Sequence, residues 1–165
     1  MVYAIESPRV LRTRSDFGAV GLLHGSAVGK ALLAFLPEAR RALSTPLQRL
    51  TPKTIIRPQA LQAELQRVRR RGRSFDDEET DPGVRCVGAP ILTPDGFAAG
   101  SISVSGPAMR LTDSVIPRLS RLVVATAREI SRRLARNDRG QPREGPQDLG
   151  QVHPVHRALH RSEDQ

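Results

Sequence analysis

The chain has 165 residues, a net charge of +9 and an apolar fraction of 38%, with no tryptophan and one cysteine. This length suits one domain with a core of its own, and a single cysteine excludes an intramolecular disulfide, as expected for the reducing cytoplasm. No apolar run approaches the roughly 20 residues that span a bilayer, and the N-terminus lacks a signal-peptide pattern, so we expect a cytoplasmic protein without membrane contact.

Two short strands and then helices are predicted for the first part of the chain. Apolar residues at 2–6 and at 19–23 favour strands on either side of a polar connection. Ser26 is a typical N-cap, and apolar residues follow it at helical spacing, which indicates a helix. Pro37 ends this helix and can open a second one at 38–43.

The start of the first helix has two features that favour an anion. Gly25 and Gly29 let another group approach the backbone of the first turn, and the free N–H groups there carry the positive end of the helix dipole. Gly29 and Lys30 also suggest a phosphate-binding loop, but the upstream glycine of that motif is missing because position 24 is His24. We therefore exclude a nucleotide site.

An amphipathic helix is predicted from Pro58 to a stop at Gly72, with a buried stripe formed by Leu61, Leu65 and Val68. Arginines at 67 and 69–71 fall in its last turn, where cations complement the dipole. The same cluster, 67–73, is the candidate for direct nucleic-acid contact. Because 24 of the 26 basic residues are arginines spread along the chain, and no aromatic residues accompany the cluster, we expect a solvated helix end.

A short strand at 73–75 leads into four consecutive acids, Asp76 to Glu79. The alternating ligand spacing of a calcium loop is absent, so no metal site is predicted. We interpret the run as an exposed acidic connection whose carboxylates can pair with the adjacent arginines. No cofactor is expected.

Two further strands are predicted around a tight turn at Pro94-Asp95-Gly96. Side chains alternate faces along a strand, so Ser101, Ser103 and Ser105 share one face while Ile102 and Val104 take the other. A line of hydroxyls near the thiol of Cys86 is either a hydrated sheet surface or the wall of a polar pocket; Ser101 has no further support as a pocket residue.

The last predicted element is a long helix capped by Thr112, with these residues expected to face the core: Val115, Leu119, Leu122, Val123, Thr126, Ile130 and Leu134. Beyond Arg136 the periodicity disappears. Residues 137–165 are rich in Gly, Pro, Gln and charged side chains, which predicts a disordered tail after a folded unit at 1–136.

Six segments in this order resemble the effector-binding domain of IclR-family bacterial transcription regulators. They are His24-Gly-Ser-Ala-Val-Gly-Lys-Ala-Leu-Leu-Ala34, Leu50-Thr-Pro-Lys-Thr-Ile55, Leu61-x3-Leu65-x2-Val68-x3-Gly72, Asp76-Asp-Glu-Glu79, Gly83-Val-Arg-Cys86 and Ser103-Val-Ser-Gly-Pro107. Each segment alone is a weak indication, whereas six at matching spacing are specific.

The resemblance implies an α+β, GAF-like fold, a curved antiparallel sheet flanked by helices with a long C-terminal helix. It implies that a small carboxylate metabolite binds the N–H groups of Ala27 and Val28, with Asp76, Cys86, Ser103 and Ser105 completing the site. Two positions depart from the family pattern: Gly88 replaces the commoner alanine, and Arg73 replaces an aromatic residue.

Assembly follows from the same resemblance. A homodimer or homotetramer is implied, with DNA bound through a winged helix-turn-helix domain. We find no such pattern before His24, and 23 residues could not hold one, so this domain is expected to be missing from the chain.

Two other hypotheses stay open at this point. One is a thiol-dependent enzyme with Cys86 as nucleophile, His24 as base and Asp76 as its orienting group. Cys86 falls in a predicted strand and not at a helix N-terminus that would stabilise its thiolate, so a buried thiol is the simpler interpretation. The other is a stand-alone small-ligand-binding domain.

Overall fold

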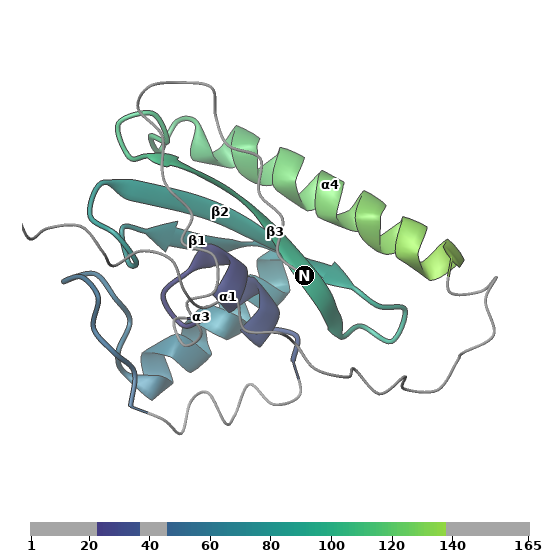
Figure 1. The fold of residues 1–165 in the computed structure, drawn as a ribbon, viewed down its shortest axis with the longest axis horizontal. Coiled ribbons are helices and arrows are strands. Elements are labelled where there is room, and N and C mark those ends of the chain that lie inside the picture. Colours follow the sequence, from purple (N-terminus) through teal and green to yellow (C-terminus); the bar gives the residue numbers. More distant parts are fainter. Residues whose placement is uncertain (1–22, 37–45, 138–165) are drawn as a thin grey trace, which may run out of the picture.

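Three antiparallel strands with helices on both faces make up the computed structural model, which describes residues 23–36 and 46–137 (Figure 1). The elements in chain order are α1 (Ala27–Leu33), α3 (Pro58–Arg71), β1 (Ser74–Asp77), β2 (Val84–Leu92), β3 (Ala98–Pro107) and α4 (Ile116–Asn137). The expected α+β fold with a long C-terminal helix is confirmed. The strand expected at 2–6, most of the one at 19–23, the helix at 38–43 and residues 138–165 lie outside the described residues.

The sheet has the strand order β1-β2-β3, with β2 in the middle. Cys86 of β2 pairs with Asp76 of β1 on one side and with Ser105 of β3 on the other. The predicted turn between β2 and β3 is present: the N–H of Gly96 donates to the carbonyl of Thr93 at 2.9 Å. Gly96 has a φ of 82°, which a residue without a Cβ adopts at little cost.

One face of the sheet is covered by α4. Val87 and Ala89 of β2 pack with Ile116, Val123 and Ala127 of the helix in one buried cluster. Val87 and Ala89 pair with Val104 and Ile102, so α4 meets the sheet face that lies opposite the three serines.

The rotation of α4 about its axis differs from the prediction. Val123 is buried, but Leu122, also expected in the core, is 57% exposed, and Leu134 is exposed as well. The helix carries two adjacent apolar stripes, and periodicity alone does not tell which one meets the sheet. The start of the helix was also predicted too early: α4 begins at Ile116, and the carbonyl of Thr112 accepts the N–H groups of Val115 and Ile116 in a preceding turn.

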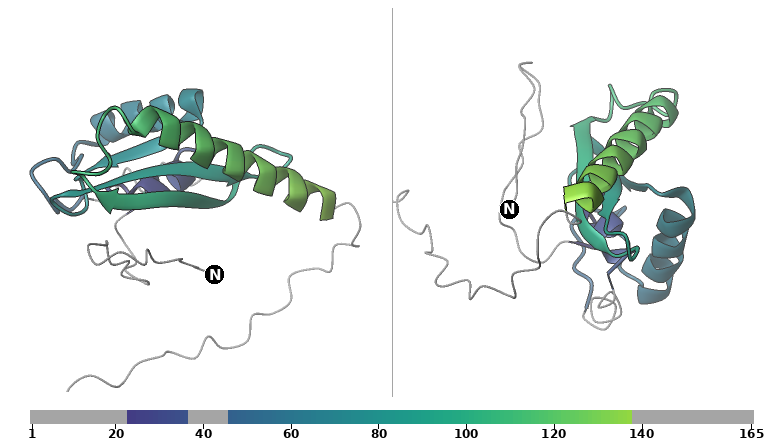
Figure 2. Two further views of the ribbon diagram at one scale, coloured as in Figure 1. Left: turned by 90° about the horizontal axis from the view of Figure 1, so that it is seen from above. Right: turned by 90° about the vertical axis from the view of Figure 1, so that its right-hand side faces the viewer.

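The opposite face of the sheet is covered by α1, which in turn packs on α3 (Figure 2). Leu33 and Ala34 at the end of α1 form a second core with the predicted stripe of α3: Leu61, Leu65 and Val68. The α3 boundaries agree with the sequence, because Pro58 occupies the first turn and Gly72, with a φ of 67°, donates its N–H to the carbonyl of Val68 at 2.8 Å. No helix in the described residues is long and apolar enough to cross a membrane.

Two glycines allow the close packing of α1. A Cβ on Gly29 would lie 2.2 Å from the carbonyl oxygen of Leu23, so the preceding chain crosses the helix at this residue. A Cβ on Gly88 in β2 would lie 2.8 Å from the carbonyl oxygen of Ala27. The first turn of α1 therefore lies directly against the middle strand.

Candidate functional site

The register of the sheet gathers most of the predicted site residues on the face that meets α1. Asp76, Cys86 and Ser105 form one cross-strand row, and Ser74, Gly88 and Ser103 form the next row on the same face. Because Gly88 lies against Ala27, the start of α1 stands beside both rows. Ser103 and Ser105 are exposed and Cys86 is half-buried, so the β3 side of this face is accessible in the structure.

Ser101 joins the same arrangement, although beyond its place on the serine face of β3 it had no support as a pocket residue. Its hydroxyl donates to the carbonyl of Val28 at 3.1 Å and links β3 to the first turn of α1. This contact joins residues 73 positions apart, which sequence spacing cannot predict.

The first turn of α1 is capped as predicted. The Ser26 hydroxyl accepts the N–H of Gly29 at 3.1 Å, and the Ser26 carbonyl accepts the N–H of Lys30 at 2.9 Å. The N–H groups of Ala27 and Val28 have no partner inside the helix. Ala27 is buried, and its carbonyl accepts the Ser74 hydroxyl at 2.6 Å, whereas Val28 is 36% exposed.

Cys86 is a protonated thiol at neutral pH. Burial raises its pKa to about 11, the hydrogen bond with Ser105 lowers it, and the nearby Asp76 carboxylate raises it further. His24, the general base of the enzyme hypothesis, interacts with a different group. It is buried, with Nε2 2.8 Å from the carbonyl oxygen of Gln48. No hydrogen bond joins His24 to Cys86 in the described part of the chain.

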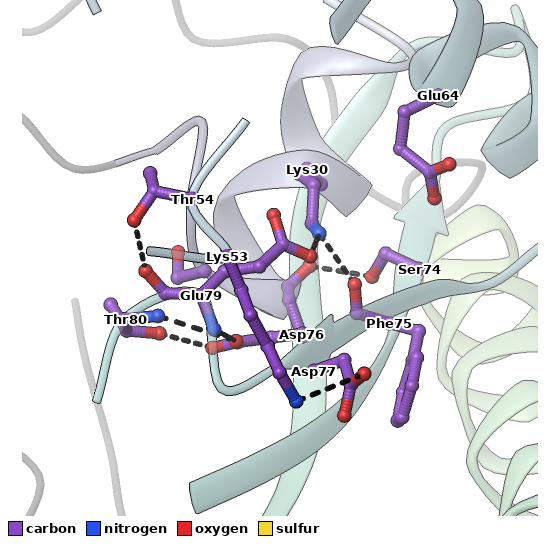
Figure 3. Close-up of polar contacts among 12 residues, drawn as sticks. Lys30, Lys53, Thr54, Glu64, Ser74, Phe75, Asp76, Asp77, Glu79 and Thr80 are labelled. Atoms are coloured by element: carbon purple, nitrogen blue, oxygen red, sulfur yellow. Dashed lines mark hydrogen bonds and ion pairs between the residues drawn. The ribbon is translucent and has the colours of Figure 1, made fainter. Parts of the chain in front are cut away.

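Asp76 lies in the row with Cys86 and Ser105, but its carboxylate is used within the protein. Its Oδ1 accepts the N–H of Glu79 at 2.7 Å and that of Thr80 at 3.4 Å, and Oδ2 accepts the hydroxyl of Thr80. The side chain is 1% exposed and closes the loop that follows β1 (Figure 3).

The acidic run 76–79 is therefore not the exposed connection that the sequence suggested. Asp76 and Glu79 are buried, and the ion-pair partners of the run are Lys30, Lys53 and Arg85 in place of the arginines of α3. The physical reason is that the first and last acids of the run point into the protein, where Lys30 supplies a cation. Within the described residues, no three metal-binding side chains gather.

Sequence reasoning missed the ion pair between Lys30 and Glu79. The Lys30 side chain has no exposed surface, and its ammonium group pairs with Oε1 of Glu79 and donates to the carbonyl of Phe75 (Figure 3). The pKa of Glu79 is raised because burial outweighs the lowering by Lys30. A lysine inside an apolar helix, with acids later in the chain, was the available signal.

Comparison with known proteins identifies the class to which this α+β domain belongs, the C-terminal domain of a bacterial transcription regulator. The model for "Bacterial transcriptional regulator IclR C-terminal" matches residues 1–132. The HTH-type transcriptional regulator BhcR of Paracoccus denitrificans (strain Pd 1222) is 40% identical over 140 residues, which cover 82% of this chain and 50% of that protein. This chain belongs to the IclR family as an effector-binding domain.

Solved structures give the same result. The Thermotoga maritima IclR structure matches with a TM-score of 0.73 and 36% identity, covering 79% of this chain and 54% of that one. The PobR inducer-binding domain from Acinetobacter, a double mutant in complex with 3-hydroxybenzoic acid, matches with a TM-score of 0.60 and 26% identity, covering 66% and 65% of the two chains. The chain spans about half the length of the curated relatives it matches. These relatives are transcription regulators, and the family is not enzymatic.

Proposed function

We propose that this chain senses a small organic acid in the cytoplasm and thereby controls DNA binding by an IclR-type regulator. The observation that carries the proposal is the sheet register, which sets Cys86 and Ser105, and next to them Ser103, beside the first turn of α1. Small ligands are fixed in orientation by a few such convergent polar groups.

The polar groups on this face suit a carboxylate. The N–H groups of Ala27 and Val28, the hydroxyls of Ser103 and Ser105 and the protonated thiol of Cys86 are all donors. Asp76 contributes by holding the loop beside Cys86, since its oxygens are engaged. The complex of the similar PobR domain with 3-hydroxybenzoic acid supports a small carboxylic acid as the ligand.

The response to the ligand is a shift between assemblies. A homodimer or homotetramer of the regulator presents its winged helix-turn-helix domains in different arrangements, and the acid favours the one to which it binds more tightly. DNA contact in this mechanism comes from those domains and not from the residues of the sheet and helices described above.

The test is thermal unfolding with monocarboxylates, beginning with 3-hydroxybenzoate and aliphatic hydroxy acids. A ligand at a hundred-fold excess over its Kd stabilises the folded state by about 2.7 kcal/mol, which raises the Tm by several degrees. We expect the double substitution Ser103→Ala with Ser105→Ala to weaken binding at least about ten-fold, because two donors are lost. The control is Ser114→Ala, in the turn before α4, which should leave the shift intact. An unchanged Tm shift in the double variant would show that the acid binds elsewhere.

A further inference from the structure

We propose that the buried Lys30–Glu79 ion pair is a positioning device for the candidate site, holding the 78–80 loop so that the Asp76 carboxylate keeps its orientation beside Cys86. The inference deepens the proposed function and rests on it for the ligand. The geometric part concerns Cys86 and can be tested without a ligand.

Glu79 is held from three elements at once (Figure 3). Lys30 of α1 pairs with its carboxylate, the Thr54 hydroxyl donates to its carbonyl oxygen at 2.7 Å, and Asp76 accepts its N–H at 2.7 Å. The neighbouring carbonyl of Glu78 accepts the Thr51 hydroxyl at 2.7 Å. The loop is therefore fixed by α1, by the 50–54 turn and by β1.

The Asp76 contact connects this loop to the site. The same carboxylate that accepts the N–H groups of Glu79 and Thr80 stands directly across from Cys86 in the sheet register. If Glu79 moved, Asp76 would lose the donors that fix its rotamer. Lys30 is on the helix whose first turn faces Gly88, so the pair also ties the start of α1 to this end of the sheet.

Stabilisation alone does not account for this pair. A buried ion pair loses about as much in desolvation as it gains in attraction, and apolar residues of the same volume often serve stability equally well. Here Oε2 of Glu79 is buried without a hydrogen-bond partner among the described residues, and Asp76 adds a second buried carboxylate to a single ammonium group. What an apolar pair could not supply is a directional side-chain contact that ties residue 79 to α1.

Cys86 is a built-in reporter of this geometry, because it is the single cysteine of the chain. Thiolate absorbance and the rate of alkylation by iodoacetamide therefore report on Cys86 alone. In the intact protein its pKa is raised to about 11, with burial as the main cause and Asp76 contributing.

The test variant replaces both charges by residues of similar volume, Lys30→Met with Glu79→Met. We expect a folded protein in which residue 79 keeps its backbone contacts with Thr54 and Asp76 but loses its tie to α1. The loop then moves more freely, Cys86 gains water, and the pKa of its thiol falls from about 11 toward 9.0. Alkylation at pH 8 should then be at least about ten-fold faster, since the thiolate fraction rises about ten-fold when the thiol pKa falls from about 11 to about 10. The variant Glu79→Gln keeps the shape of the side chain and an acceptor for Lys30, so we expect a smaller increase in the alkylation rate. This variant is the decisive one if the double variant does not fold.

Two controls separate positioning from loss of stability. Leu65→Ala weakens the core between α1 and α3 without touching the loop, and Lys53→Met removes an exposed partner of the same loop. Neither should accelerate alkylation under native conditions. The proposal is overturned if the folded variants react like the wild type, or if Leu65→Ala accelerates the reaction as much as they do. Failure of every acid to shift the Tm would instead contradict the proposed function and leave the Cys86 result standing.

Discussion

At the scale of single residues, Cys86 links the chemistry of the site to stability. Its thiol lies between Asp76 and Ser105 on a half-buried strand, so its charged form is disfavoured in the folded protein. A chain that contains a cysteine, a histidine and an aspartate therefore need not use the cysteine as a nucleophile. It also makes the folded state sensitive to alkaline pH.

We predict that Cys86→Ala reduces the loss of stability at alkaline pH. The folded pKa of about 11 lies above the ordinary value of 9.0, so the contribution of the thiol is complete below pH 9 and is lost as the pH rises toward 11. Between pH 8 and pH 10 the wild type should lose about 1 kcal/mol more than the variant. Urea unfolding at the two pH values measures this difference. Equal losses in both proteins would mean that the thiol titrates normally.

Gly29 and Gly25 form a matched pair for testing the packing of α1. A Cβ at position 29 would collide with the backbone of Leu23, which cannot turn aside, whereas one at position 25 would meet its neighbours at 3.6 Å or more. We predict that Gly29→Ala costs about 2 kcal/mol even after the gain in helix propensity, and that Gly25→Ala costs less than about 1 kcal/mol. Denaturant unfolding of both variants checks the contrast, and similar costs would contradict the crossing at Leu23.

The residues of the site were predictable to the extent that they depend on local geometry. Alternation along β3 placed Ser103 and Ser105 on one face, and the Ser26 cap placed the free N–H groups of α1. The Lys30–Glu79 pair was not predictable in this way, because it joins residues 49 positions apart. The use of Asp76 by its own loop was hidden for a different reason: four adjacent acids look alike in sequence, and only the fold decides which of them point inward.

At the scale of elements, sequence signals were strongest where a local stop or start existed. The helix α3 begins at Pro58 and ends before Gly72, as predicted. The turn at Gly96 connects β2 and β3, also as predicted. The rotation of α4 lacked such a signal, because apolar residues occupy both positions 122 and 123. Tertiary contact with β2 selects Val123, and propensity has no part in this choice.

We predict that substitutions at these two adjacent positions have very different costs. Val123→Ala should lower the free energy of unfolding by about 2 kcal/mol, since it opens a cavity against β2. Leu122→Ala should change it by less than about 0.5 kcal/mol, because the side chain is largely exposed. Thermal or urea unfolding at low protein concentration measures both. A large cost for Leu122→Ala would place that stripe, and not the Val123 stripe, in a buried interface.

At the scale of the whole molecule, the sheet separates the arginines of α3 from those of α4. The arginines at the end of α3 lie in the layer beyond α1, whereas those of α4 lie on the other side of the sheet (Figure 2). Glu129 pairs with Arg132, Arg133 and Arg136, which neutralises part of the second group. Within residues 23–36 and 46–137, the arginines of α3 and α4 thus do not form one continuous surface for a duplex.

This arrangement leads to a prediction for nucleic acid. The chain alone should bind duplex DNA weakly at low salt, without sequence preference, and should release it by about 200 mM salt, because the contacts are with phosphates. Arg70→Ala with Arg71→Ala, and separately Arg121→Ala with Arg128→Ala, should each lower the salt dependence by at most about two counterions, since neither group contains all the contacts. Fluorescence anisotropy with two unrelated duplexes over a salt series measures this. Selective retention of one sequence at about 200 mM salt would show that the described helices read DNA directly. We do not expect this result, because the sheet separates the arginines of α3 from those of α4.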